Sequence, residues 1–316
     1  MLRKKALRKI FVTTMSIFII MTIYLIPLTE KSVETNLEFE YITDLANSSI
    51  YLLDNNNYLV KTKVLLDSEK IEDKIKSIIS NLTISSNAKF PDNLKGLIPK
   101  NTKLNKVTIE KDLVSLDFSK EFMNVDEETS LKLIESLVYS ITELDDINKV
   151  NISIEGNYLE IYPNTSKKLY LPLTRDLGIN KEYSYTSLKD LTKVTIYYQE
   201  LIDEDTYYVP VTKYLNNEEN KDKINIIVEE LATSYIYEDN LRSILNENVE
   251  LIDKELVDND LLILDFNNAL FDAGSKIKEE VLYMISASVF ANYDVNTVSF
   301  RVNGKEVENI KRSSLH

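Results

Sequence analysis

Two aspartates are the residues in this sequence best placed to do chemistry. Asp117 and Asp265 each stand near the end of an expected strand, in the similar stretches LVSLDFSKEF (113–122) and LLILDFNNAL (261–270). A glycosidase needs two carboxylates about 5–10 Å apart across the scissile bond. These two lie far apart in the chain, so that chemistry would require two domains that face each other. The simpler interpretation, which we prefer, is that each aspartate hydrogen-bonds the turn after its strand.

Three short acidic runs are the only other candidate ligands, in this case for calcium. They are DEE (126–128), DD (145–146) and DED (203–205). None shows the alternating ligand spacing of a calcium-binding loop. The first run also suits the first turn of a helix, where carboxylates interact favourably with the helix dipole. We therefore predict that the chain has no metal site.

The residue inventory excludes much of enzyme chemistry. The chain has no cysteine, and its single histidine is the last residue, His316. Cysteine nucleophiles, Cys- or His-ligated metal sites and Ser-His-Asp triads are thereby excluded. There are 5 glycines, and no stretch reads GxGxxG or GxxxxGK[ST], so a glycine loop for phosphate is absent. We predict a protein that is not an enzyme, with no catalytic, cofactor-binding or metal-binding residues and no cofactor.

Charge and aromatic content narrow the class of partner. The chain carries 37 Lys and Arg against 51 Asp and Glu, a net charge of −14, which argues against nucleic acid. Many of the 19 tyrosines come in pairs: 183/185, 197/198, 207/208 and 235/237. Exposed tyrosines can stack on wall sugars or form a protein interface. Half-buried strands also favour tyrosine for packing alone, so all three interpretations remain open.

The N-terminal segment is typical of a membrane anchor. Residues 1–9 (MLRKKALRK) form a basic tail, and residues 10–29 carry no charge. A helix of that length covers the ~30 Å hydrocarbon core of a bilayer. The basic tail places the N-terminus in the cytoplasm and the bulk of the chain outside, with residues 30–47 as a spacer. A cleaved signal peptide, and hence a secreted protein, is the alternative, although no small-x-small cleavage site follows the apolar run.

The rest of the chain is a tandem repeat. Asp117-Phe118 matches Asp265-Phe266 at a shift of 148 positions, and the same shift places Gly156 on Gly304. A repeat of this size predicts two copies of one domain. We assign residues 48–157 to the first copy, 158–193 to a packed linker, 194–307 to the second copy and 308–316 to a tail.

Each copy reads as a mixture of helices and strands. Alternation predicts strands at 48–53, 58–66, 103–109, 113–118 and 150–154 in the first copy, and at 194–201, 207–214 and 298–302 in the second. Helical spacing of apolar residues predicts helices beginning near Ile71 and over 127–144, with counterparts over 222–231 and 275–291. We expect an α+β fold in which two helices pack on one face of a small sheet.

The repeat resembles a known family. LDFSKEF followed by SITELDDINKVNISIEGN (140–157) resembles the GerMN domain of sporulation and spore germination, and LDFNNALF followed by SVFANYDVNTVSFRVNGK (288–305) is similar to it again. The resemblance implies an α/β sandwich like the ring-building motif of secretion-system rings. It also implies non-catalytic work in the assembly that joins mother cell and forespore. Family members often carry a lipid-bearing cysteine, and this chain has none.

Together these features predict a non-enzymatic, membrane-anchored envelope protein of sporulation or germination that helps to assemble a ring or channel-like complex. Its expected partners are other envelope and sporulation membrane proteins, further copies of itself, and the cytoplasmic membrane through residues 10–29, but not nucleic acid. A peptidoglycan-binding module at the outer face of the membrane is the alternative. A third possibility, a wall hydrolase, would lose activity on Asp117→Asn or Asp265→Asn.

Overall fold

The computed structural model describes residues 46–66, 68–84, 90–202, 205–233 and 241–315. The expected basic tail, the anchor at 10–29 and most of the spacer therefore lie outside the described residues. Within the described part of the chain, none of the helices is both long and apolar enough to cross a membrane.

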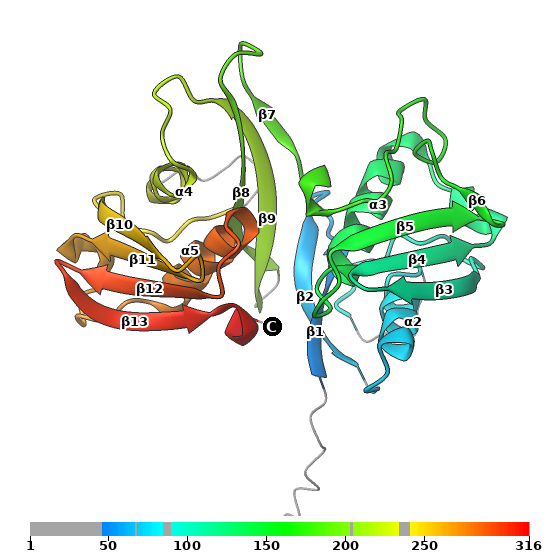
Figure 1. The fold of residues 1–316 in the computed structure, drawn as a ribbon, viewed down its shortest axis with the longest axis horizontal. Coiled ribbons are helices and arrows are strands. Elements are labelled where there is room, and N and C mark those ends of the chain that lie inside the picture. Colours follow the sequence, from blue (N-terminus) through cyan, green and yellow to red (C-terminus); the bar gives the residue numbers. More distant parts are fainter. Residues whose placement is uncertain (1–45, 67, 85–89, 203–204, 234–240, 316) are drawn as a thin grey trace, which may run out of the picture. The chain divides into compact units, whose positions relative to one another are not determined.

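The first copy places its helices between a hairpin and a sheet (Figure 1). Strands β1 (Ala46–Leu53) and β2 (Leu59–Leu66) form the hairpin, with Asn57 in the left-handed conformation at the turn. Helix α2 (Ile71–Asn81) buries Ile75, Ile78 and Ile79. Helix α3 (Glu127–Ile141) is buried at every position from Leu133 onward, as expected for a helix with protein on both sides.

The sheet of the first copy has the order β3-β4-β5-β6. Its strands are β3 (Leu104–Glu110), β4 (Leu113–Phe118), β5 (Lys149–Ile154) and β6 (Asn157–Tyr158). Strands β4 and β5 are parallel and are connected through α3, while the other pairs are antiparallel. Apolar side chains alternate along β4, so Val114, Leu116 and Phe118 lie in the core.

The second copy repeats this arrangement. Strands β8 (Leu191–Ile202) and β9 (Asp205–Asn216) form its hairpin, and α4 (Lys223–Ala232) and α5 (Glu279–Asn292) are its helices. Its sheet has the order β10-β11-β12-β13. The strands are β10 (Leu251–Val257), β11 (Leu261–Phe266), β12 (Thr297–Val302) and β13 (Lys305–Lys311). The mixed α and β composition predicted for both copies is confirmed.

Several element bounds differ from those expected. Strand β8 begins at Leu191, three residues before the expected 194, because residues 191–193 already pair with β9. Helix α5 begins at Glu279 rather than 275, since Ser275 is in the left-handed conformation. Strand β13 and a 3₁₀ turn at Arg312–Leu315 occupy most of the stretch assigned as a tail.

A five-stranded sheet connects the two copies. Its order is β1-β2-β9-β7, with β8 also paired to β9, and β7 (Glu182–Ser184) comes from the segment between the copies. Strands β2 and β9 share one antiparallel pair, Lys61 with Tyr208. In the same segment, Leu173 pairs with Val150 of the first copy, and Ile179 accepts a hydrogen bond from Thr212 of the second. Residues 159–190 therefore contact both copies.

Candidate functional site

Asp117 and Asp265 have the same structural role in the two copies. Asp117 Oδ1 accepts hydrogen bonds of 2.8 Å from the N–H of Gly156 and from the Ser153 hydroxyl. Asp265 accepts bonds of 3.0 and 2.9 Å from the N–H of Gly304. Each aspartate thus holds a turn, as expected, but this turn follows the neighbouring parallel strand and lies 39 residues further along the chain.

The hydrogen bonds also fix the charge state of Asp117. Partial burial works to raise its pKa, but the donors Gly156 N–H, Ser153 and Asn105 outweigh burial and hold the pKa of Asp117 below its ordinary value. This carboxylate therefore stays ionised near neutral pH, which suits a hydrogen-bond acceptor and not a general acid. The hydrogen-bond partners of each aspartate lie in its own copy, so these contacts do not bring the two carboxylates together.

The acidic runs show no metal geometry in the described part of the chain. Asp126 caps α3 by accepting a 2.7 Å hydrogen bond from Thr129 N–H, which agrees with the helix-start interpretation. Asp145 and Asp146 follow α3, and of the third run only Asp205, in β9, is described. Among the described residues, no group of three or more His, Cys, Asp or Glu side chains could hold a metal ion.

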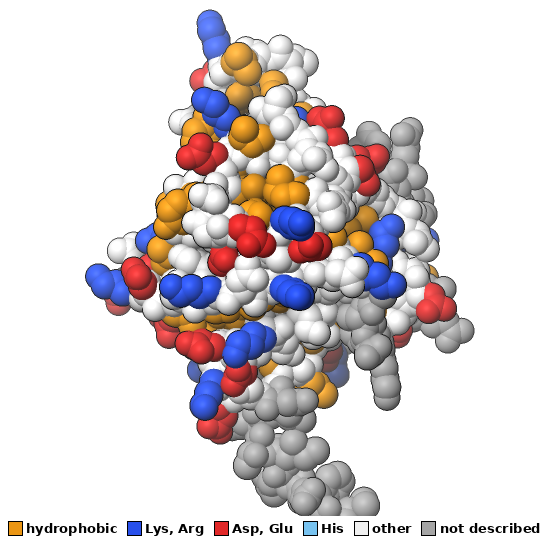
Figure 2. Space-filling model, turned by 90° about the vertical axis from the view of Figure 1, so that its right-hand side faces the viewer, with side chains coloured by type: hydrophobic (Ala, Val, Ile, Leu, Met, Phe, Trp, Pro, Cys, Tyr) orange, Lys and Arg blue, Asp and Glu red, His pale blue; other side chains and the backbone are white. Residues whose placement is uncertain are grey.

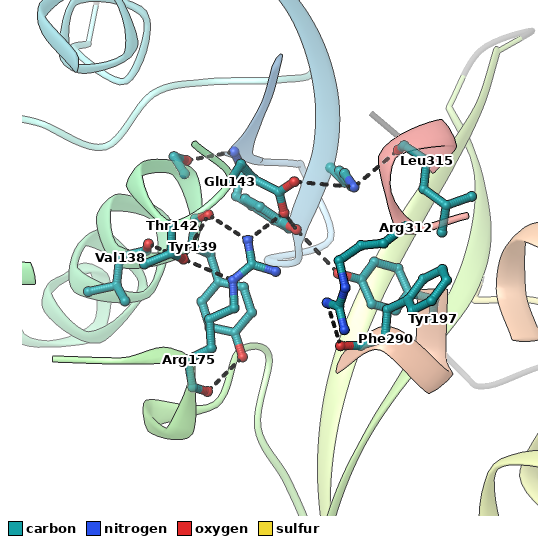
Figure 3. A network of polar contacts seen from close by, with 12 residues as sticks. Val138, Tyr139, Thr142, Glu143, Arg175, Tyr197, Phe290, Arg312 and Leu315 are labelled. Atoms are coloured by element: carbon teal, nitrogen blue, oxygen red, sulfur yellow. Dashed lines mark hydrogen bonds and ion pairs between the residues drawn. The ribbon is translucent and has the colours of Figure 1, made fainter. Parts of the chain in front are cut away.

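A network of polar contacts lies where the two copies meet (Figure 3). Its centre is a pair of buried tyrosines, Tyr51 of β1 and Tyr197 of β8, whose hydroxyl oxygens are 3.2 Å apart. Tyr51 also donates a 2.7 Å hydrogen bond to Oε1 of Glu143. Burial, followed by the nearby Glu143 carboxylate, raises the pKa of Tyr51 well above its ordinary value. Both hydroxyls are therefore neutral and serve as hydrogen-bonding groups.

Glu143 forms ion pairs with the two cations of this cluster. Its side chain is 3% exposed and pairs with Arg175 at 2.5 Å and with Lys61 at 3.5 Å. Arg175 comes from the segment between the copies. It also donates hydrogen bonds to the Thr142 hydroxyl and the Tyr139 carbonyl at the end of α3 in the first copy. Lys61 Nζ lies 3.5 Å from the carbonyl oxygen of Leu315, near the C-terminus of the second copy. The two cations and the tyrosine donor offset the free-energy cost of burying the Glu143 carboxylate.

A second contact between the copies pairs two carboxyl groups. Asp54, at the end of β1, is 3% exposed, and Glu200 of β8 is fully buried. The two groups interact electrostatically, and neither Asp54 Oδ2 nor Glu200 Oε2 has a hydrogen-bond partner among the described residues. Asn56 donates a 2.7 Å hydrogen bond to the other oxygen of Glu200. Burial, together with Asp54, raises the pKa of Glu200 to about 8, so Glu200 is mostly protonated near neutral pH.

Both contacts join equivalent positions of the repeat. The stretches IYLLD (50–54) and IYYQE (196–200) match at a shift of 146, which places Tyr51 on Tyr197 and Asp54 on Glu200. The neighbouring hydrogen bonds are repeated as well, because Ser140 and Ser288 accept bonds of 2.9 Å from the N–H groups of Tyr51 and Tyr197. Equivalent residues meet each other in a twofold dimer interface. The two copies therefore pack against each other in the manner of a covalently linked dimer.

Asn180 adds a further connection from the segment between the copies. Its side-chain amide donates to the carbonyl of Leu59 in β2 at 2.9 Å and to the carbonyl of Pro210 in β9 at 2.8 Å. Its amide oxygen accepts from the Leu59 N–H at 2.9 Å. Buried backbone groups of both hairpins are thereby satisfied at the point where Pro210 cannot donate.

The arrangement of these groups fits a structural junction better than a reaction centre. A cavity of about 260 Å³ opens beside the cluster and is lined by Glu143, Arg175, Tyr197 and Arg312, among others. Arg312 is occupied as the cap of α5, because its guanidinium donates to the carbonyls of Phe290, Tyr293 and Val295. Among the charged groups that line the cavity, Glu143, Arg175 and Arg312 are thus paired with protein groups.

Comparison with known proteins identifies both copies. A family model described as sporulation and spore germination, named Germane, matches residues 49–160 and 195–308. The chain belongs to the Germane family. The spore germination protein GerM of Bacillus subtilis is 32% identical to this Germane protein over 287 residues, which are 86% of this chain and 77% of GerM. The resemblance to GerMN domains is therefore confirmed.

A solved structure supports the same assignment. The tandem GerMN domains of the sporulation protein GerM from Bacillus subtilis superpose with a TM-score of 0.76 at 30% identity, covering 84% of this chain and 96% of the other. Membership of the Germane family assigns this protein a role in sporulation or spore germination. Sequence patterns did not predict the junction of the two Germane domains, although the IYLLD and IYYQE match was a signal that could have located it.

Proposed function

We propose that this Germane-family protein is a non-enzymatic envelope component that holds two domains as one unit and uses them to assemble a ring or channel-like complex between mother cell and forespore. The observation that carries this proposal is the buried junction around Tyr51 and Tyr197, 3.2 Å apart. A reaction centre needs unpaired groups facing a substrate, whereas the carboxylate of Glu143 is paired within the protein. A fixed pair of domains doubles the valence of each chain.

The free edges of the sheets support self-assembly. Strands β10 and β13 are the two edges of the second sheet, and β3 is an edge of the first. On β10, Ile252 is 55% exposed and Leu256 is 51% exposed. Edge strands with exposed apolar residues are templates for pairing with another chain. Contact between opposite edges of one sheet is head-to-tail, which closes into a ring when the rotation allows it.

Membrane attachment would also favour self-assembly of the chain into a ring. The uncharged run at 10–29, behind a basic tail, is the anchor in this proposal, with the N-terminus in the cytoplasm and both domains outside. Confinement of the domains to a plane raises their effective concentration. On the face shown in Figure 2, hydrophobic side chains form small patches between charges of both signs, which fits contacts of limited area with several neighbours.

Engineered cysteines test self-assembly directly, because the chain has no cysteine of its own. Ile252→Cys on β10 and Val307→Cys on β13, placed in one chain, should give a ladder of disulfide-linked oligomers in membranes under mild oxidation. A chain with Leu188→Cys, which is 80% exposed but lies on neither edge, is the control and should remain monomeric. Adducts with a different envelope protein would support assembly with other partners. Monomer alone in both chains would contradict the proposal.

A further inference from the structure

The segment after β5 forms a groove that belongs to the first copy. Its backbone runs beside β5, where Leu159 N–H donates to the Ile152 carbonyl at 3.0 Å and Leu173 pairs with Val150. Between these points the chain folds back on itself, because Leu169 N–H donates to the Glu160 carbonyl at 2.8 Å. The groove that results has a volume of about 590 Å³.

Three exposed apolar side chains line this groove. Tyr158 is 64% exposed, Tyr170 is 78% exposed and Ile161 is 47% exposed. Single exposed hydrophobic residues are ordinary, but a cluster of large ones around one depression marks a binding site. Two tyrosines with free ring faces are suited to stacking on a flat apolar surface of a ligand.

Polar groups of the same groove specify the chemistry of that ligand. Asn151 lines the groove, and its Oδ1 atom is buried without a hydrogen-bond donor. Glu160 and Lys168 line it as well. A ligand with hydroxyl groups beside an apolar face would stack on the tyrosines and hydrogen-bond the exposed side chains of Glu160 and Lys168.

We propose that this groove binds a chain of neutral sugars. A pyranose ring presents apolar C–H faces to aromatic rings and hydroxyl edges to carboxylate groups, which matches Tyr158, Tyr170 and Glu160. The net charge of −14 disfavours anionic polymers but does not repel a neutral glycan. This binding function goes beyond assembly and does not depend on it.

The second copy shows that the groove is a feature of the linking segment. Ser299 occupies the position equivalent to Asn151 and is 2% exposed. Strand β13 pairs beside it, with Ser299 opposite Asn309, and continues as a regular strand from Lys305 to Lys311. The domain common to both copies therefore does not by itself require Tyr158, Ile161 or Tyr170 to be exposed.

Binding measurements with the full chain in lipid nanodiscs test the proposal. We expect the wild type to bind both an N-acetylglucosamine tetramer, followed by calorimetry, and purified peptidoglycan, followed by sedimentation. Tyr158→Ala combined with Tyr170→Ala should raise the Kd for the tetramer about tenfold or more. Tyr170→Trp keeps a stacking surface and should keep binding. The matched control is Tyr183→Ala, which removes a 62% exposed tyrosine outside the groove.

Three results would overturn the proposal. The first is wild-type protein that binds neither probe. The second is binding that survives the double alanine variant or falls equally in Tyr183→Ala, since the groove would then not be the site. The third is binding to peptidoglycan without binding to the tetramer, because the ligand would then be a wall component other than the sugar chain. Circular dichroism of each variant confirms that a loss of binding is not a loss of folding.

Discussion

The hydroxyl oxygen of Tyr51 lies 3.2 Å from that of Tyr197, its equivalent in the other copy, and both side chains are buried. Two residues at equivalent positions that meet each other are the mark of a twofold contact. The symmetry is broken next to this contact, because Glu143 of the first copy corresponds to Ala291 of the second at the shift of 148. One carboxylate thus accepts a hydrogen bond from Tyr51, and Lys61 and Arg175 balance its charge.

Removal of one hydroxyl should weaken the junction. Tyr51→Phe deletes the 2.7 Å hydrogen bond to Glu143 and leaves Tyr197 without its partner hydroxyl. We expect the free energy of unfolding in urea to fall by about 1–3 kcal/mol, the usual cost of a lost hydrogen bond to a buried charged group. The exposed Tyr183→Phe should change it by less than about 0.5 kcal/mol. Equal effects of the two substitutions would show that the junction contributes little stability.

Neutralisation of Glu143 should lower the free energy of unfolding more than Tyr51→Phe does. Glu143→Gln leaves Arg175 and Lys61 without their buried carboxylate, and we expect a loss of about 3 kcal/mol or more in the free energy of unfolding. Asp112→Asn is the matched control, because it breaks an ion pair of 3.0 Å with Lys149 that is exposed to solvent. That substitution should have little effect on stability. A small effect of Glu143→Gln would mean that water already reaches the cluster.

The Asp54–Glu200 pair should make stability depend on pH. In the unfolded chain Glu200 loses its proton at its ordinary pKa of 4.5, whereas burial beside Asp54 holds the proton in the folded state up to a pKa of about 8. The folded state therefore binds more protons between these values, and the contribution of Glu200 to stability is lost as pH rises from 4.5 to 8. Urea unfolding at several pH values should show this fall, followed by a plateau.

Glu200→Gln provides the control for that titration. The amide keeps the shape of the neutral side chain but cannot ionise, so the fall in stability across the same pH window should be reduced. If the variant and the wild type show the same pH dependence, another group must be responsible. Ionisation of Glu200 in the wild type would place a negative charge in a buried site between the copies, which should also loosen their contact.

The two turn glycines should be equally sensitive to substitution. Gly156 has φ +81° and Gly304 has φ +77°, and a Cβ atom added to either would meet no atom within 4 Å. Gly156→Ala and Gly304→Ala should therefore each cost about 1 kcal/mol through backbone conformation alone. Thermal unfolding measures the cost. A much larger effect at one glycine would indicate a contact with a partner at that turn.

Substitution of the strand-end aspartates separates structure from catalysis. Asp117→Asn and Asp265→Asn each keep one carbonyl oxygen that can accept from the turn glycine. We expect near-normal folding, and no loss of function in a complementation assay of sporulation. A folded protein that loses function in either variant would favour the hydrolase interpretation instead.

Local patterns in the sequence were sufficient for most elements of each copy, but not for β6 or β13. Alternating residues around Leu116 and Ile152 predicted β4 and β5, and Asp126 marked the start of α3. That Asp117 bonds a turn was predicted, but the expected turn was the one directly after its own strand. Its partner Gly156 lies beside it only because β4 and β5 pair in parallel, which is a tertiary relationship that no local pattern encodes.

Local sequence patterns could not predict the contact between the two copies either, because that contact is also a tertiary relationship. Glu143 has partners at Lys61 and Arg175, which are distant in sequence, so its burial leaves no periodic signal near it. The stripe of apolar residues on α3 predicts a buried face but does not say that a second copy covers the end of that helix. Only the match of Tyr51 with Tyr197 across the repeat pointed to the contact, and a match alone does not show that the residues touch.

The most direct test of the account is the yield of heat-resistant spores from a source strain that lacks this chain, compared with the same strain complemented by the wild-type gene. An envelope assembly role predicts a large loss of heat-resistant spores with normal vegetative growth, and recovery on complementation. Normal spores that germinate poorly would place the role in exit from dormancy. An unchanged spore yield with unchanged germination would contradict the account.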